Sequence, residues 1–285
     1  VIDGETVYSE EVVWFPKTNA DPDYHYDGIV AALKAAAEKM PRVDAVGVSS
    51  AGNFIDNRTM VASLFLKVPK DLFNKKVKDI YIRAVRDTFG RNVPLVVAND
   101  GDVSALAGAM GLGENQVLGI AMGTSEAVGY VDEKGNITGW LNELAFMPVD
   151  VNPSAMEDEW SGDIGCGVKY FSQDSVIKLA PRAGIALDEA LSPAEKLKVV
   201  QKLMEENDNR AEKVYRSIGT YLGHSLAYYY ELYHCKHVLL LGRVMSGKGG
   251  DLILEEAKRV LTEEYPECTG KLFPALPDEK SRRVG

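Results

Sequence analysis

Short apolar runs alternate with segments of helical periodicity along the first hundred residues. Residues 45–50 and 95–99 are rich in small and β-branched apolar side chains and are predicted as buried strands. Residues 29–40 and 80–89 carry apolar side chains at helical spacing and are predicted as helices. Residues 1–15 alternate around an Asp-Gly turn, which predicts strand, turn and strand. Alternating strands and helices are typical of an α/β domain with a largely parallel sheet.

The pattern restarts after Gly111-Leu112-Gly113, which we interpret as a hinge and a candidate domain boundary. Residues 142–163 form a long, acidic and irregular segment, and compact domains seldom contain such a segment without a functional reason. The other elements predicted after the hinge are strands at 117–122, 127–131 and 237–242, and helices at 193–206, 210–233 and 251–264.

A polar segment, Asn99-Asp100-Gly101-Asp102, follows the apolar run that ends at Ala98. In open α/β sheets, chemistry is usually done where a buried strand ends and a helix begins. Asp102 and Ser104 are suited to capping that helix, which leaves Asp100 as the candidate for a working role. The same residue types also simply shape strand-to-helix turns, so this segment alone leaves both interpretations open.

Two glycine-rich segments are candidate anion sites. Gly123, Thr124 and Ser125 lie between two predicted strands, where amides and hydroxyls can bind phosphate oxygens. The loop 242–250 leaves a buried strand and opens a helix, which favours an anion or a nucleotide. It is neither a Rossmann fingerprint nor a Walker A loop. Its Arg243 and Lys248 could contact phosphate or simply be solvated.

Two phosphate loops and one carboxylate at a strand end predict phosphoryl transfer, which depends mainly on positioning and electrostatics. In that reaction Asp100 would accept the proton of a substrate hydroxyl. Mg²⁺ would bridge the phosphates of the nucleotide.

The composition of the chain disfavours some classes of binding partner and indicates a cellular compartment. Acidic residues outnumber basic ones by 42 to 32, a formal net charge of −10 that disfavours nucleic acid and anionic membrane surfaces. The sequence contains no apolar run of about 18 residues, the length that a membrane-spanning helix requires. The three cysteines form neither a C-x-x-C pair nor a disulfide framework, which is typical of a reducing cytoplasm. We therefore expect a cytoplasmic protein.

The segments 99–108, 123–125 and 239–251 together resemble the ROK family of repressors, open-reading-frame proteins and sugar kinases, within the actin/hexokinase superfamily. The sequence is similar, less closely, to the N-acetylglucosamine kinase and activator-ATPase branch. The resemblance implies an α/β fold of two actin-like (ribonuclease H-like) lobes, residues 1–112 and 113–285. It further implies that the first strands of the N-terminal lobe, with their phosphate loop, would precede Val1.

The resemblance also implies roles for single residues. Asp100 matches the family's catalytic base and Asn99 a sugar ligand. The residues that match its nucleotide and phosphate loops are Gly123, Thr124, Ser125, Gly242, Arg243, Ser246 and Gly247.

The sugar side departs from the family pattern. The G-E-x-G-H motif falls on residues 142–146, where Glu143 remains a candidate sugar ligand but Phe146 replaces the histidine. The zinc segment falls on residues 161–168 and retains only Cys166, while Val168 stands where a further glutamate is usual. One thiolate cannot build a tetrahedral zinc site, so no metal site is expected there.

Nearby carboxylates could bind hydroxyls, although a solvated acidic loop is the simpler interpretation; they are Glu157, Asp158, Glu159 and Asp163.

Two functions follow from these observations. The first is an ATP-dependent kinase of a sugar or sugar-like hydroxyl compound, with Asp100 as the base. The second is a non-catalytic ROK-like protein that binds a small ligand and has a regulatory role. A DNA-binding repressor is disfavoured by the acidic charge and by the lack of a helix-turn-helix in this sequence. The resemblance also implies a homodimer.

Overall fold

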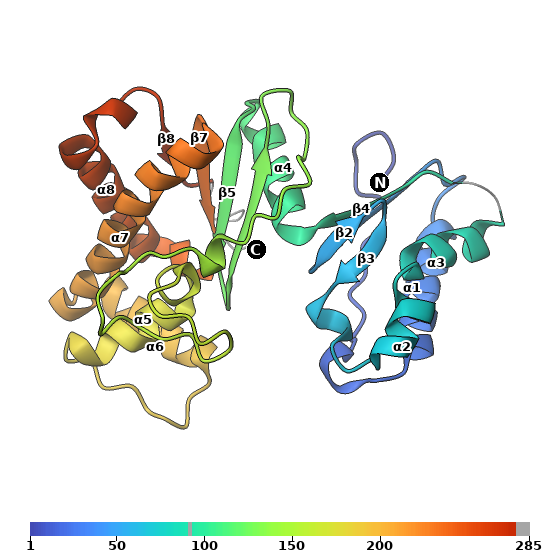
Figure 1. Cartoon of the computed structure of the whole chain (residues 1–285), viewed down its shortest axis with the longest axis horizontal. Helices are drawn as coiled ribbons and strands as arrows, with labels where there is room; N and C mark the ends of the chain where they lie inside the picture. The colour runs from blue at the N-terminus through green and yellow to red at the C-terminus, as the bar shows by residue number, and fades with distance from the viewer. Residues whose placement is uncertain (91–92, 278–285) are drawn as a thin grey trace. The chain divides into compact units, whose positions relative to one another are not determined.

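The computed structural model describes residues 1–90 and 93–277 of the 285-residue chain. The chain divides into two compact units, Val1–Asp100 and Gly101–Gly285 (Figure 1). No helix among the described residues is long and apolar enough to cross a bilayer.

The first unit is built on two strands that the apolar pattern predicted. β1 (Val46–Ser50) and β4 (Leu95–Asn99) pair in parallel, with Ser50 opposite Asn99 at their carboxyl ends. The helices α1 (Pro22–Ala37) and α3 (Ile80–Phe89) pack against each other. The shorter elements are β2 (Asn53–Ile55), β3 (Arg58–Val61), α2 (Lys70–Leu72), and the single turns Pro16–Thr18, Ser63–Phe65 and Phe73–Val77.

Two expectations for this unit were wrong. Residues 1–15 form no strand pair and contribute only an isolated bridge between Ile2 and Glu5. A two-residue bridge is no ladder, and an alternating segment forms a stable strand only when further strands pair with it. α1 begins at Pro22 rather than at residue 29, because the Asp21 carboxylate accepts the N–H of Asp23 and Pro22 has the φ that a first helical turn requires.

The second unit contains a four-stranded sheet in the order β6-β5-β7-β8. β5 (Val117–Met122) and β6 (Glu126–Val131) form an antiparallel hairpin, while β7 (His237–Leu241) and β8 (Phe273–Ala275) add in parallel. The helices are α4 (Asp100–Leu112), α5 (Gln173–Arg182), α6 (Pro193–Glu205), α7 (Asn209–Tyr233) and α8 (Gly247–Glu264), with single turns η4 (Leu144–Phe146), η5 (Gly167–Lys169), η6 (Arg243–Met245) and η7 (Pro266–Cys268).

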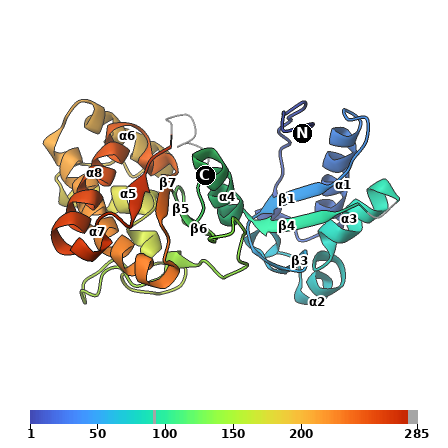
Figure 2. The same ribbon diagram turned by 90° about the horizontal axis from the view of Figure 1, so that it is seen from above.

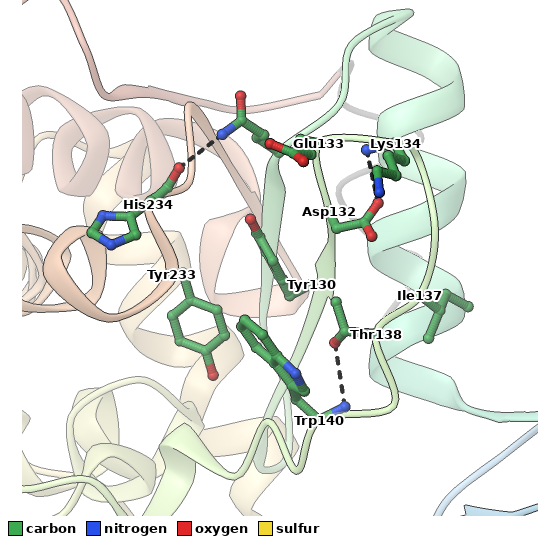
Figure 3. Close-up of a pocket in the computed structure, with 10 residues that line it drawn as sticks. Tyr130, Asp132, Glu133, Lys134, Ile137, Thr138, Trp140, Tyr233 and His234 are labelled. Carbon is green, nitrogen blue, oxygen red and sulfur yellow. Dashed lines mark hydrogen bonds between the residues drawn. The ribbon is translucent and has the colours of Figure 1, made fainter.

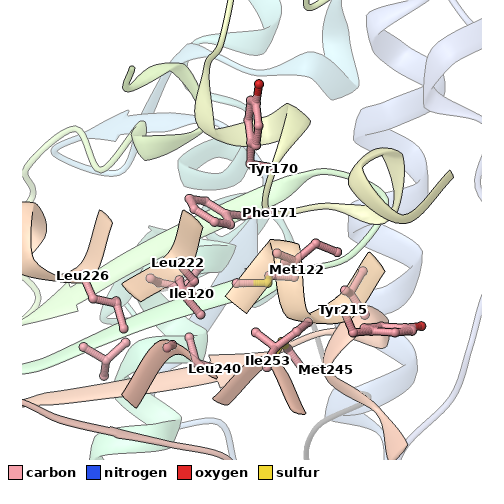
Figure 4. Close-up of a cluster of buried hydrophobic side chains, with 14 of the residues drawn as sticks. Ile120, Met122, Tyr170, Phe171, Tyr215, Leu222, Leu226, Leu240, Met245 and Ile253 are labelled. Carbon is pink, nitrogen blue, oxygen red and sulfur yellow. The ribbon is translucent and has the colours of Figure 1, made fainter. Parts of the chain in front are cut away.

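The sheet is covered on both faces. Alternate residues of β5, such as Ile120 and Met122, pack with α7 and α8 in the main core (Figure 4). The other face carries Val117 and Ala121, which pack with Ala105 of α4. Figures 1 and 2 show α4 on the side of the sheet away from α7 and α8. This double coverage explains why β5 is buried along its whole length.

α4 belongs to the second unit, whereas the expected boundary at residue 112 would place it in the first. A side chain on Gly129 of β6 would lie 2.2 Å from the carbonyl oxygen of Gly101, so the helix backbone rests directly on the sheet. Gly119 of β5 approaches Ala105 in the same way. Because of these contacts, α4 packs with the second unit, and the chain divides into its two units between Asp100 and Gly101.

Candidate functional site

The two predicted glycine loops converge at one edge of the second unit's sheet. β5 and β7 are parallel and Ala121 pairs with Leu241, so Gly123 and Gly242 both follow the same edge. Gly242 has φ +92°, and a side chain there would lie 2.3 Å from the carbonyl oxygen of Met122. Only glycine fits this close approach.

We expect Gly242→Ala to destabilise the protein by at least about 2 kcal/mol, since it combines a backbone conformation restricted to glycine with a main-chain clash. Urea unfolding measures the change. Gly111→Ala is the control, because Gly111 lies in α4 with open space at the Cβ position, and there alanine should stabilise by about 0.5–1 kcal/mol. Equal effects of the two substitutions would contradict this account.

The N-terminus of α8 adjoins the Gly242 loop. The loop turns through η6, and α8 begins at Gly247, directly after Ser246. Gly249 lies against the ring of Tyr215 and Gly250 against the carbonyl of Met245, so neither position has space for a side chain. The first N–H groups of an 18-residue helix, together with its dipole, favour an anion at this end, and the Glu205 carboxylate accepts the N–H of Lys248 there at 3.0 Å.

The two cations of the loop behave differently. Lys248 donates from its ammonium to the carbonyl of Glu205 and to the side chain of Asn207, both at 2.9 Å. It therefore ties α8 to the end of α6, which is neither of the roles we considered. Arg243 is exposed, and its carbonyl accepts a hydrogen bond from Gln201.

The Gly123–Ser125 loop is held from both sides. The N–H of Gly123 donates to the carbonyl of Ser125 at 2.9 Å, which closes the turn between β5 and β6. The carbonyl of Gly123 accepts the N–H of Gln173 at the start of α5, also at 2.9 Å. Gly123 is buried, whereas Thr124 and Ser125 are exposed. The loop therefore presents two hydroxyls beside the Gly242 loop.

The candidate base lies where the sequence predicted a strand to end. Asn99 is the last residue of β4, and its side-chain amide donates to the carbonyl of Gly52 at 2.9 Å. Asp100 is the first residue of α4 and is exposed. Asp102, which we expected to cap this helix, is buried and accepts hydrogen bonds from the Asn142 side chain at 2.8 Å and from the Tyr130 N–H at 3.4 Å.

The segment expected to bind sugar follows β6. Glu143 is exposed and directly precedes η4. Phe146 is 38% exposed, and its ring lies 5.7 Å from that of Trp160. Cys166 is buried. Within residues 1–90 and 93–277, no three His, Cys, Asp or Glu side chains are grouped so that they could hold a metal ion.

A buried lysine organises the acidic segment. Lys169 of η5 forms ion pairs with Asp158 at 3.0 Å, Glu159 at 2.8 Å and Asp174 at 2.7 Å, with its side chain 4% exposed. Burial lowers the pKa of Lys169, but its bonds to the carboxylates outweigh that effect and the net shift is upward. Hydrogen bonds from Lys169 and Lys178 lower the pKa of Glu159 to about 2.

The expectation that the carboxylates of this segment are solvated was therefore wrong for two of them. Asp158 is buried and Glu159 is paired, whereas Glu157 and Asp163 are exposed as expected. No local sequence signal selects Lys169, because its partners come from two separate stretches, residues 158–159 and the start of α5.

Glu126 is a second residue that sequence reasoning missed. It is the first residue of β6 and is 6% exposed, and burial raises the pKa of its carboxyl to about 8. The sequence did contain a signal for its burial. Glu126, Val128 and Tyr130 are every second residue of the strand and share one face, and Val128 and Tyr130 face the main core.

An aromatic pocket of about 520 Å³ lies at the other end of β6. Trp140 stacks on Tyr130 with ring centroids 5.6 Å apart, and Tyr233 of α7 lies beside them (Figure 3). The Tyr233 hydroxyl donates to the side chain of Asn142, which in turn donates to Asp102. Trp140 is 54% exposed, so its packing leaves part of the ring open to solvent.

Comparison with known proteins adds a family and a fold. The model of the ROK family matches residues 1–272. No curated protein sequence matches the chain. A ROK family glucokinase from Streptomyces griseus, solved with glucose and AMPPNP, has a TM-score of 0.65 at 20% identity, over 94% of this chain and 87% of that one.

Two further solved structures are similar. A ROK hexokinase from Thermus thermophilus has a TM-score of 0.65 at 21% identity, over 90% of this chain and 84% of that one. A ROK family transcriptional regulator, a homologue of the E. coli MLC protein, has a TM-score of 0.68 at 15% identity, over 94% of this chain and 68% of that one. At these identities the similarity establishes the α/β, actin-like fold. The chain belongs to the ROK family.

Proposed function

We propose that the protein is an ATP-dependent kinase that phosphorylates a hydroxyl of a sugar or sugar-like compound. The observation that carries this proposal is the convergence of the Gly123–Ser125 loop, the Gly242 loop and the N-terminus of α8 at one sheet edge. Main-chain N–H groups, hydroxyls and a helix dipole gathered there suit the phosphates of a nucleotide.

Each residue has a proposed role. The amides and hydroxyls of Gly123, Thr124 and Ser125 bind phosphate oxygens. Asp100 accepts the proton of the attacking hydroxyl, and an exposed carboxylate at a helix start is accessible for that purpose. Mg²⁺, when bound with the nucleotide, neutralises charge on the phosphates. Asn99 and Glu143 bind substrate hydroxyls, and Gly242, Arg243, Ser246 and Gly247 bind the nucleotide.

The test is calorimetric titration of the full-length protein with ATP·Mg²⁺ and a panel of sugars, followed by an ADP-release assay. We expect nucleotide binding, and ADP release that depends on one class of sugar. Absence of nucleotide binding would reject the proposal. Light scattering on the same sample tests the homodimer that the family resemblance implies.

The alternative is a non-catalytic regulatory protein that binds a small ligand. Phe146 favours it, because this partly exposed aromatic ring stands where the family pattern has a histidine. Sugar binding without ADP release for any sugar in the panel would support this alternative and reject the kinase.

A further inference from the structure

Glu126 places a carboxyl group where the fold requires an apolar side chain. It pairs with Met122 across the hairpin and so forms the base of the Gly123–Ser125 loop. Its side chain faces the core that contains Val128 and residues of α7. Within residues 1–90 and 93–277, neither carboxyl oxygen has a hydrogen-bond partner. A buried polar group without a partner is costly and calls for a functional explanation.

The carboxyl group adjoins the segment that carries Glu143. A side chain on Gly167 of η5 would lie 2.6 Å from Oε2 of Glu126 and 2.4 Å from the carbonyl oxygen of Leu144. Both oxygens therefore lie on the same side of Gly167, where only a glycine leaves room for them. Leu144 opens η4 directly after Glu143. The Glu126 carboxyl thus lies between the phosphate loop and the expected sugar-binding segment.

The surroundings favour the neutral acid. β5 and η4 carry no titratable side chain, and the nearest on α7 is the buried phenol of Tyr229. Burial and the charge of Glu126 raise the pKa of Tyr229 well above its usual value, so this phenol supplies no counter-charge. Lys169 of η5 is bound to Asp158, Glu159 and Asp174. Burial alone raises the pKa of Glu126 to about 8.

We propose that Glu126 is a positioning residue, which as a neutral acid donates a hydrogen bond to the Leu144 carbonyl and so holds residues 143–146 against the phosphate loop. A carboxylate has no proton to donate and repels a carbonyl oxygen. Ionisation therefore releases the segment and places a negative charge at the base of the Gly123–Ser125 loop, so the binding of an anionic nucleotide weakens as pH rises. The identity of the ligand rests on the proposed function, whereas the positioning role of Glu126 rests on its own contacts.

The test compares the wild type with Glu126→Gln, an uncharged side chain of the same shape. AMPPNP binding is measured by calorimetry at pH 6.5 and pH 9. We expect the wild-type Kd to rise about tenfold, because pH 9 lies about one unit above the midpoint, and the Gln variant to show no such rise. Glu133→Gln, an exposed change at the far end of the same hairpin, should behave as the wild type. An equal pH response in all three proteins would overturn the proposal.

Thermal unfolding separates this proposal from the proposed function. The folded carboxyl titrates near 8 and a free one near 4.5, so wild-type stability should fall between those pH values and then level off. The Gln variant should lack this fall. If AMPPNP binds at no pH, the kinase is rejected, yet this fall would still support a buried acid at Glu126. A constant difference in Tm between the two proteins from pH 4.5 to 8 would reject the role of Glu126.

Discussion

Asp100→Asn should lower sugar-dependent ADP release by about 10²–10⁴-fold, the usual contribution of a general base. Asparagine keeps the size of the side chain but cannot accept the hydroxyl proton. Nucleotide binding should remain within about twofold, because the phosphate loops are held by contacts within the second unit, between β5, β7, α5 and α8. The ADP-release assay and the AMPPNP titration measure the two quantities separately.

Asp27→Asn is the matched control for this experiment. Asp27 is an exposed aspartate of α1 in the same unit, and its substitution makes the same chemical change away from the strand end. It should leave turnover unchanged. Turnover that survives in Asp100→Asn would remove Asp100 from the mechanism, and loss of turnover in both variants would show a general effect of charge.

Lys169→Met should destabilise the protein by about 3–5 kcal/mol, because it leaves the buried Asp158 carboxylate without its cation. The change also breaks the link between the acidic segment and α5, since Lys169 binds both Glu159 and Asp174. Urea unfolding at neutral pH measures the loss. The acidic segment should lose its protection from hydrogen exchange in the same variant.

Lys178→Met is the matched control, because Lys178 pairs with Glu159 in the same cluster but its side chain is 32% exposed. Partly exposed ion pairs contribute up to about 1 kcal/mol, so this variant should lose no more than that. Equal losses in the two lysine variants would contradict the central role of Lys169.

The pH dependence of the wild type gives a further check on this cluster. The pKa of Glu159 is about 2 in the folded protein against 4.5 for a free carboxyl. Its pairing therefore stabilises the fold above pH 4.5, and the contribution is lost as pH falls towards 2. The difference in stability between the wild type and Lys169→Met should shrink over that interval.

The sequence by itself was sufficient for features that depend on local pattern. Apolar runs predicted β4, β5 and β7, and helical spacing predicted α3 and α7. The strand end at Asn99 and the glycine loops at Gly123 and Gly242 could be predicted as well, because the residue types next to a strand end or a glycine turn indicate it. The family motifs are local too, and the match over residues 1–272 confirmed the family.

Only the tertiary structure decided the features that depend on distant partners. Alternation in residues 1–15 could not form a sheet because no further strand pairs with it among the described residues. α4 packs with the second unit because Gly129 lets its backbone approach β6. Lys169 owes its role to carboxylates on two other segments, and Glu126 owes its role to apolar side chains from distant parts of the chain. Periodicity records which face of an element is apolar, whereas burial and pairing depend on what packs against that face.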